Sequence, residues 1–164
     1  MIINGTRLLR DAPIKGMLET KERLHGVSHG LSEAGYDIRI KQEVIFQPEN
    51  ASNPAGVWVG GSYSSGSFTI ASAIEEFDMP ADMVGIVHDK STWARRGLSV
   101  FNTVIEPSWR GFLTLELVYH GREKLVIPAG AGIAQVIFHS TLEPAFYGGK
   151  YQNQPDMPVG AKNG

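Results

Sequence analysis

Short apolar runs separated by glycine, proline or polar residues recur along the chain, and they restrict it to a mostly-β fold. The runs have the alternation or the β-branched and aromatic content of strands. They occupy residues 36–40, 44–46, 68–70, 83–87, 112–119, 125–128 and 133–138. The 19 glycines and 9 prolines are spread along the chain, which favours many short strands joined by turns. We therefore expect a β-barrel of the Greek-key or jelly-roll type with one or two short helices.

The length of 164 residues suits a single domain, spanning residues 1–164. Residues 6–11 are expected to form a short helix that stops before Pro13. Residues 48–66 are rich in Asn, Pro, Gly and Ser, so we predict a long surface loop there. We also predict a turn at residues 74–80, a hairpin turn at residues 120–123 and an irregular tail over residues 143–164.

Overall charge and the absence of cysteine exclude several classes of protein. A formal net charge of −2 argues against a general nucleic-acid or membrane-surface binder. The lack of cysteine excludes disulfides and thiolate zinc sites, and it is compatible with a cytoplasmic protein. The histidines do not follow a metal-binding spacing such as H-E-x-x-H. We expect neither a membrane span nor a signal peptide, because long apolar stretches are lacking.

Cations and hydroxyls are concentrated between residues 90 and 96, in the segment KSTWARR. Lys90, Ser91, Thr92 and Arg95 combine charge with hydroxyl donors, a set that suits phosphate oxygens. The alternative is a helix N-terminus capped by Ser91 or Thr92 and followed by a solvated arginine. Both interpretations stay open, because a helix N-terminus itself attracts anions.

Two glutamates near the middle of the chain are candidates for chemistry. Glu116 interrupts the nearly continuous apolar run FLTLELVY, where a carboxylate is costly unless it is paired or used. The alternative for Glu116 is an ordinary charge on an edge strand. Glu106 precedes Pro107, so it is either a functional carboxylate or simply a turn residue.

Two segments resemble the dCTP deaminases, a family within the dUTPase-like superfamily. KSTWARRGL is similar to the phosphate-binding signature of that family, and VIEPSWRGFLTLEL is similar to its substrate and catalytic segment. Supporting similarities occur at GYDIR, at GAGIAQVIF and at YGGKYQNQ. The likeness runs from about residue 30 to residue 154, and it implies a dUTPase-like β-barrel.

The resemblance also implies roles for individual residues. The triphosphate would bind at Lys90, Ser91, Thr92 and Arg95, although the family usually has arginine at the first of these positions. Glu106 would meet the deoxyribose hydroxyl, where the family usually has aspartate, and Thr114 belongs to the catalytic segment. Tyr147, Lys150 and Gln154 match a C-terminal segment that closes over base and phosphates.

Hydrolytic deamination at cytosine C4 requires an activated water and protons for N3 and for the departing ammonia. Glu116 is expected to be the general base and acid, in a dry pocket that raises its pKa. Ser91 and a backbone carbonyl near Phe101 or Asn102 would position the water, and Arg95 would supply charge nearby. Zinc is not expected, because the chain lacks the cysteine ligands of zinc deaminases. Mg²⁺ is expected on the triphosphate, and the family implies a homotrimer with sites between subunits.

The expected substrate is dCTP, with the related triphosphates dUTP and dTTP as further ligands. One departure favours an alternative, because the segment between Thr103 and Glu106 is shorter than in many bacterial deaminases. Its spacing matches the third motif of dUTPases, in which the acidic residue orients water. The alternatives are therefore a dUTPase-like or bifunctional enzyme giving dUMP, and a non-catalytic nucleotide-binding domain.

Overall fold

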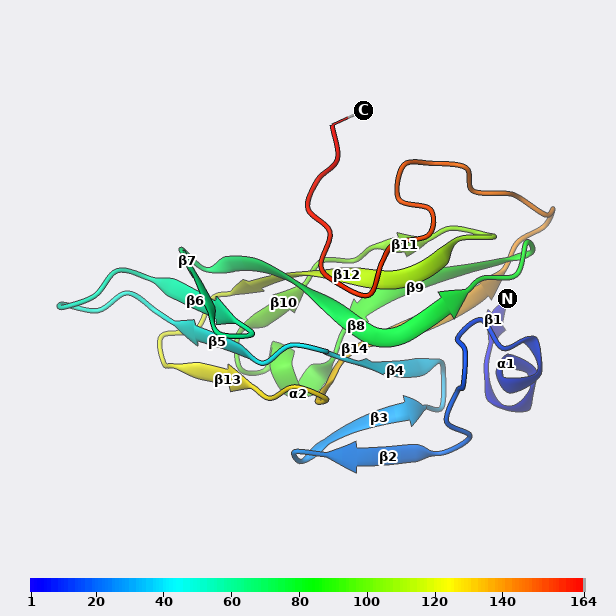
Figure 1. Ribbon diagram of the computed structural model, residues 1–164. Coiled ribbons are helices and arrows are strands. Elements are labelled where there is room, and N and C mark those ends of the chain that lie inside the picture. The colour runs from blue at the N-terminus through cyan, green and yellow to red at the C-terminus, as the bar shows by residue number, and fades with distance from the viewer. Residues whose placement is uncertain (164) are drawn as a thin grey trace.

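The computed structural model describes residues 1–163, and within them the chain forms fourteen strands and two short helices. The predicted mostly-β fold is confirmed (Figure 1). The first helix, α1 (Gly5–Asp11), lies where it was predicted. It ends because Ala12 adopts a left-handed conformation, with φ of 43°, immediately before Pro13. The second helix, α2 (Ser91–Ala94), is a single turn.

The largest sheet is antiparallel and has seven strands in the order β11-β9-β14-β4-β3-β2, with β1 also paired to β14. Its strands are β1 (Ile2–Ile3), β2 (Lys21–Leu24), β3 (Val27–Leu31), β4 (Tyr36–Arg39), β9 (Met83–Asp89), β11 (Val104–Ile105) and β14 (Gly132–Ser140). Long strands β9 and β14 are neighbours, and their apolar inward faces form one wall of the core.

Two smaller antiparallel sheets complete the fold. One has the order β10-β12-β8 and contains β8 (Phe68–Asp78), β10 (Leu98–Val100) and β12 (Arg110–Tyr119). The other has the order β13-β5-β6-β7 and contains β5 (Val44–Gln47), β6 (Gly56–Val59), β7 (Ser62–Ser65) and β13 (Leu125–Ile127).

Strand β8 is longer than the sequence indicated, and the turn predicted at residues 74–80 is wrong for most of its length. The strand continues to Asp78, and its acidic side chains are accommodated by cationic partners. Buried Glu75 accepts hydrogen bonds from both the backbone N–H and the Nε of Arg39, at 2.8 and 2.9 Å. Partly buried Glu76 pairs with Lys15 at 2.5 Å. These cationic partners offset the cost of desolvating the two carboxylates, which is why an acidic segment can continue as a strand.

The long loop predicted at residues 48–66 is also wrong, because β6 and β7 form a hairpin within it. Gly60 and Gly61 make the two-residue turn, with φ of 53° and 87°. Positive φ at both positions gives the turn a backbone twist that matches the flanking strands. Trp58 and Tyr63 lie directly opposite each other, with ring centroids 4.9 Å apart. The loop proper is limited to residues 48–55.

Residues 120–123 do turn the chain, but they do not make the predicted hairpin. Strand β12 precedes this turn and β13 follows it, yet β13 pairs with β5 in another sheet. The turn therefore carries the chain from one sheet to the next.

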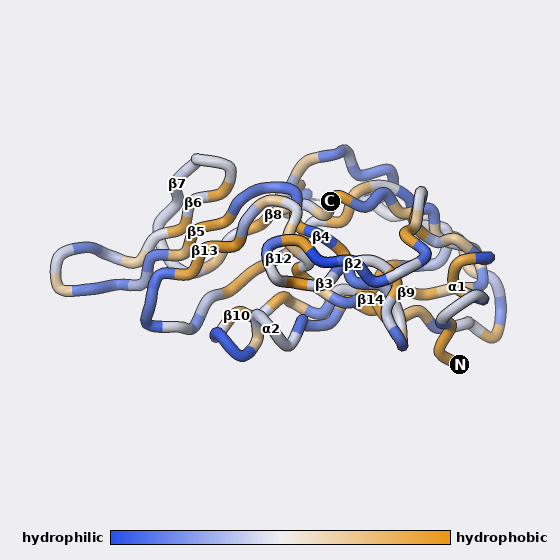
Figure 2. Tube along the Cα trace, turned by 90° about the horizontal axis from the view of Figure 1, so that it is seen from below, coloured by the Kyte–Doolittle hydropathy of each residue, from blue (hydrophilic) through white to orange (hydrophobic). Residues whose placement is uncertain are grey.

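Apolar residues concentrate along the strands, and polar residues concentrate in the connecting loops such as that between β5 and β6 (Figure 2). A single cluster of buried side chains extends through the three sheets and contains Phe46, Phe77, Leu115 and Phe138. Within residues 1–163, no helix has both the length and the apolar character required to span a membrane.

Part of the outward face of the largest sheet is apolar. Cross-strand pairing places Val104 beside Ile86, and Ile86 beside Ile137, on the face opposite the core. Ile2 lies further along the same face, beside His139. Ile2 and Val104 are 49% and 52% exposed. The described chain therefore leaves part of an apolar sheet face open to solvent.

Candidate active site

A cavity of about 460 Å³ opens on the outward face of β8 and β12. Five residues predicted from the sequence line it together: Glu106, Thr114, Glu116, Tyr147 and Gln154. Its apolar lining includes Phe68, Ile70, Trp109, Leu113 and Tyr151. The cavity is thus an apolar hollow with a few convergent polar groups, which is the usual composition of a small-molecule site.

Alternation along β12 explains why Glu116 points into this cavity. Leu115 and Leu117 are almost fully buried in the core, so Thr114 and Glu116 face the other way. Glu116 lies opposite Ile70 of β8. The apolar run that surrounds Glu116 in the sequence therefore belongs mainly to the opposite face of the strand.

Glu116 is half-buried, and its carboxylate has few partners. The hydroxyl of Thr103 donates a hydrogen bond to Glu116 Oε2 at 3.2 Å. Within residues 1–163 none of the ion pairs involves Glu116. Burial in the apolar cavity raises the pKa of Glu116, while hydrogen bonds from its own backbone and from Thr103 act in the opposite direction. The direction matches the expectation from the sequence.

The C-terminal segment forms one wall of the cavity and is held by specific hydrogen bonds. The indole N–H of Trp109 donates to the Tyr151 carbonyl at 2.7 Å, and the Phe112 N–H donates to the Gln154 carbonyl at 3.2 Å. The Val159 N–H donates to the Thr114 hydroxyl at 3.0 Å. Over residues 143–163 the predicted tail is therefore irregular in secondary structure yet ordered across the β8–β12 pair, and Gly164 lies outside the described residues (Figure 1).

Gly111 allows this close approach of the tail to β12. Its φ is +128°, a conformation that side-chain-bearing residues rarely adopt. A Cβ atom at this position would lie 2.5 Å from the Gln154 backbone nitrogen. The structure therefore explains why glycine is needed at this position of the sequence WRGF, which the motif alone did not reveal.

Two predicted residues stand at the margin of the cavity. Glu106 is exposed at the rim, and its carbonyl accepts a hydrogen bond from the Trp109 N–H at 3.1 Å, so it also starts a turn. Lys150 does not line the cavity. Its ammonium group donates to the Lys162 carbonyl and lies 5.5 Å from the centroid of the Tyr151 ring.

The predicted phosphate-binding residues lie apart from the cavity. Ser91, Thr92 and Arg95 are exposed on and just after α2, and none of them lines the cavity around Glu116. Figure 1 shows α2 and the C-terminal segment on opposite sides of the β8–β12 pair. One chain therefore presents the two predicted halves of the site in different places.

A helix does begin at Ser91, as the alternative interpretation of this segment expected, but neither Ser91 nor Thr92 caps it. Lys90 occupies the N-cap position of α2 and makes no side-chain capping bond. Its carbonyl accepts hydrogen bonds from the N–H groups of Trp93 and Ala94, both at 3.0 Å. The Ser91 and Thr92 hydroxyls are consequently not used to cap the helix.

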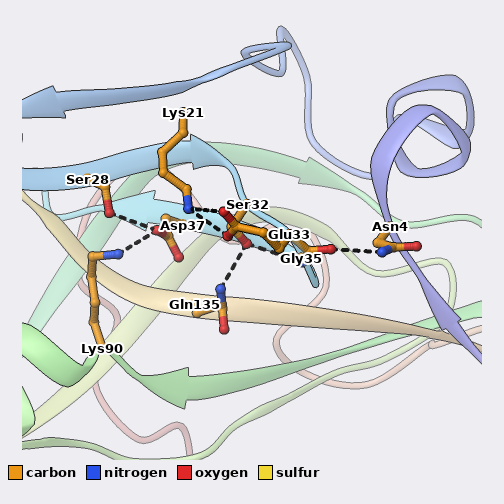
Figure 3. Close-up of polar contacts among 9 residues, drawn as sticks. All are labelled: Asn4, Lys21, Ser28, Ser32, Glu33, Gly35, Asp37, Lys90 and Gln135. Atoms are coloured by element: carbon orange, nitrogen blue, oxygen red, sulfur yellow. Dashed lines mark hydrogen bonds and ion pairs between the residues drawn. The ribbon is translucent and has the colours of Figure 1, made fainter.

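A buried ion pair attaches α2 to the largest sheet. Lys90 Nζ lies 2.5 Å from Asp37 Oδ2, and the residues are only 9% and 3% exposed. The Ser28 hydroxyl also donates to Asp37 Oδ2, at 3.3 Å (Figure 3). Nearby, the Trp93 indole N–H donates to the Gly132 carbonyl at 2.7 Å. Lys90 thus has a structural partner within its own chain.

Sequence reasoning missed several residues of the site. It assigned no site role to Thr103, Trp109 or Tyr151, and it did not pair Asp37 with Lys90. Thr103 directly precedes the segment VIEPSWRGFLTLEL, Trp109 lies within that segment, and Tyr151 lies within YGGKYQNQ. Position beside or within a motif was therefore an available signal for these three residues. The Asp37–Lys90 pair spans 53 residues of sequence and depends on sheet order, which no local pattern shows.

Comparisons with known proteins agree with the geometry. The family model described as dCTP deaminase-like matches residues 60–141. A dCTP deaminase from Acidobacterium capsulatum is 35% identical over 175 residues, covering 94% of this chain and 96% of the relative. A dCTP deaminase from Roseiflexus castenholzii is 36% identical and covers 85% of this chain and 87% of the relative.

Solved structures share the fold at low sequence identity. A 2′-deoxycytidine 5′-triphosphate deaminase from Agrobacterium tumefaciens has a TM-score of 0.55 and 17% identity. That match covers 84% of this chain and 47% of the Agrobacterium chain. A dUTPase from phage phi11 of S. aureus, whose structure concerns a structural Mg(II) ion, has a TM-score of 0.54 and 14% identity and covers 84% and 95% of the two chains. The predicted dUTPase-like fold is confirmed.

The ion pair gives a stability prediction. Replacing Lys90 with Ala leaves Asp37 as a buried, uncompensated charge, so the free energy of unfolding should fall by roughly 3–5 kcal/mol. Urea denaturation monitored by tryptophan fluorescence measures the loss. The matched control is Lys124→Ala, because Lys124 is exposed and should tolerate truncation with little effect. An equal, small effect for both variants would contradict a structural role for the pair.

Proposed function

Because the chain belongs to the dCTP deaminase family, we propose that it hydrolyses dCTP to dUTP and ammonia, with Glu116 as general base and acid. The observation that carries the proposal is the half-buried Glu116 carboxylate in an apolar cavity, where burial raises its pKa. A raised pKa lies closer to neutral pH. The same carboxyl group can then both accept and donate a proton at the working pH of the enzyme.

The proposed reaction adds one water to cytosine C4 and releases one ammonia. Glu116 removes a proton from the water while the oxygen bonds to C4, and it delivers that proton to N3. The tetrahedral centre then collapses as the exocyclic nitrogen leaves with a further proton from the attacking oxygen, transferred through Glu116. We assign the positioning of the water to Ser91 and to the carbonyl of Phe101 or Asn102, with Arg95 supplying charge nearby.

We assign the base to the cavity and the triphosphate to α2. Trp109, Tyr147 and Tyr151 supply aromatic surface, and Thr114 and Gln154 supply polar groups within the same hollow. Ser91, Thr92 and Arg95 are exposed and supply the hydroxyl and guanidinium donors that phosphates require. Lys90 contributes to phosphate binding mainly indirectly, by positioning α2, because its ammonium group is paired with Asp37. Lys150 and the exposed Glu106 lie at the margin, where they would meet phosphate and sugar.

The separation of the two halves supports a homotrimer in which each site lies between subunits. The Glu116 cavity of one copy would receive the α2 segment of a neighbour, because α2 of the same chain lies on the other side of β8 and β12. The open apolar face around Ile86, Val104 and Ile137 is suited to burial between copies. Closed cyclic assembly would bury this face in every subunit.

Mg²⁺ would arrive with the triphosphate. Within residues 1–163 there is no cluster of three or more His, Cys, Asp or Glu side chains that could hold a metal ion. Mg²⁺ commonly keeps several waters and binds substrate phosphates rather than an all-protein cage, so this residue set suits a nucleotide-borne ion. The ion would neutralise phosphate charge near Arg95. We place the enzyme in the cytoplasm, which suits a chain without cysteine.

A second candidate function has one observation in its favour. Glu106 lines the same cavity as Glu116, so a second carboxylate is available to orient a water toward the phosphates. An enzyme that uses both would convert dCTP to dUMP. We rank deamination to dUTP first, because the segments KSTWARRGL and YGGKYQNQ both resemble those of the deaminases.

Glu116→Gln should abolish most deamination while retaining nucleotide binding. The amide preserves size but cannot exchange protons, and general acid–base groups typically contribute about 10²–10⁴-fold in rate. Ammonia release measures turnover, and calorimetric titration with dCTP and Mg²⁺ measures binding. Glu123→Gln is the matched control, since Glu123 is exposed and outside the cavity. Near wild-type ammonia release from Glu116→Gln would remove the proposed mechanism.

The products distinguish the candidate functions. Incubation with dCTP and Mg²⁺ should give equal amounts of ammonia and dUTP, without pyrophosphate. Anion-exchange chromatography resolves dUTP, dUMP and dCMP. Ammonia with dUMP and pyrophosphate would establish the bifunctional alternative, whereas dCMP and pyrophosphate without ammonia would refute deamination. Nucleotide binding without any product would indicate a non-catalytic domain.

A further inference from the structure

We propose that Thr103 is a positioning residue for Glu116, holding its carboxyl group in one orientation through both of its protonation states. The inference rests on the proposed function, in which Glu116 alternates between base and acid. Thr103 stands outside every motif that the sequence analysis assigned to the site, yet it lines the same cavity as Glu116.

The backbone around Thr103 is fixed on two sides. The Val87 N–H of β9 donates to the Thr103 carbonyl at 3.0 Å. The Phe101 N–H donates to the Glu116 carbonyl, also at 3.0 Å. The short segment between β10 and β11 is therefore attached to both β9 and β12, and the Thr103 hydroxyl is held at a defined place beside Glu116.

The Thr103 hydroxyl has two acceptors within reach and only one proton to donate. Glu116 Oε2 lies 3.2 Å from Oγ1, and the Phe101 carbonyl lies 3.4 Å from it. When Glu116 is ionised, the hydroxyl donates to the carboxylate. When Glu116 is protonated, its own O–H can donate to Oγ1, and the threonine proton turns to the Phe101 carbonyl. A hydroxyl can serve as donor and acceptor in this way, whereas an ammonium or amide nitrogen only donates.

The exchange also involves the carbonyl to which we assign the water. Phe101 O is free for a water when Thr103 donates to Glu116, and it becomes occupied when Glu116 carries the proton. Thr103 would thus connect the protonation state of Glu116 to the availability of the water-binding carbonyl. Water would be held most firmly while the carboxylate is in its base form.

The remaining groups near Glu116 do not duplicate this contact. The other titratable side chains lining the cavity are Glu106, Tyr147 and Tyr151. Within residues 1–163, neither these groups nor any cation forms a hydrogen bond or ion pair with the Glu116 carboxylate. Burial raises the pKa of Glu116, and the hydrogen bond from Thr103 lowers it. Loss of the hydroxyl should therefore raise the pKa further.

Thr103→Val removes the hydroxyl but keeps the branched shape of the side chain. Its kcat for ammonia release should fall about 10-fold, the effect of losing one hydrogen bond to a charged group. The rising limb of its pH–rate profile should move to higher pH, because the base form of Glu116 appears only above its pKa. Thr103→Ser should restore most of the rate and return the limb toward the wild-type position.

Thr141→Val is the matched control, because the Thr141 hydroxyl donates to the Glu143 carbonyl outside the cavity. It should leave the rate and the pH profile unchanged. Thermal melting and native mass establish that each variant folds and assembles as the wild type does. A Thr103→Val variant that fails to fold leaves Thr103→Ser as the decisive variant, which must then retain most of the wild-type rate and pH profile.

Glu116→Gln, measured in parallel, separates the role of Thr103 from the proposed function of the enzyme. If Glu116→Gln is inactive while Thr103→Val matches the wild type in rate and pH profile, the inference about Thr103 is wrong and the proposed function stands. A slower Thr103→Val with an unmoved pH profile and no rescue by serine would assign Thr103 to packing alone, which also overturns the inference. Activity in Glu116→Gln would remove the proposed function itself.

Discussion

Desolvation of the Glu116 carboxylate is the constraint on which the candidate site depends. The β8–β12 pair places the carboxylate on an outward face, and the C-terminal segment converts that face into an apolar cavity. Only Thr103 offers it a side-chain hydrogen bond within residues 1–163. A carboxylate left this poorly compensated has a raised pKa, and that property suits proton transfer better than structural support. The tail that encloses it requires Gly111, so strand conformation and site chemistry are linked.

Much of the fold followed from local patterns, because buried strands and short turns leave clear signals in sequence. The predictions were wrong in regions where a partner distant in the sequence, or a specific turn, overrides the local preference. Glu75 remains in a strand because Arg39 neutralises it, and Gly60-Gly61 makes a hairpin inside a segment whose composition indicated a loop. Five cavity residues, Glu106, Thr114, Glu116, Tyr147 and Gln154, were recognisable from their motifs, whereas Thr103, which donates to Glu116, lies outside them. The pairing of Asp37 with Lys90 was not, since it depends on the order of strands in the sheet.

The buried Lys90–Asp37 pair gives the α2 segment, to which we assign phosphate binding, a different physical character from the cavity. It fixes the start of α2 against β4, while Ser91, Thr92 and Arg95 remain exposed beyond it. A rigid support with exposed donors suits recognition of a ligand that another surface completes. The cavity, in turn, supplies the carboxylates of Glu116 and Glu106 and apolar walls, and within residues 1–163 its lining contains no cationic side chain. Each half lacks what the other provides, which is why we combine them across a subunit boundary.

Subunit mixing tests most directly whether each active site combines residues from two subunits. Glu116→Gln and Arg95→Ala chains, which we expect to be inactive when each is assembled alone, are unfolded together and reassembled at equal concentration. If every site combines Glu116 of one subunit with Arg95 of another, about one quarter of the sites in random assemblies contain both wild-type residues, and ammonia release should recover accordingly. Ammonia release by wild-type protein that has been unfolded and reassembled in the same way defines full activity. No recovery above the separate variants, despite verified mixed assemblies by native mass spectrometry, would contradict the shared site.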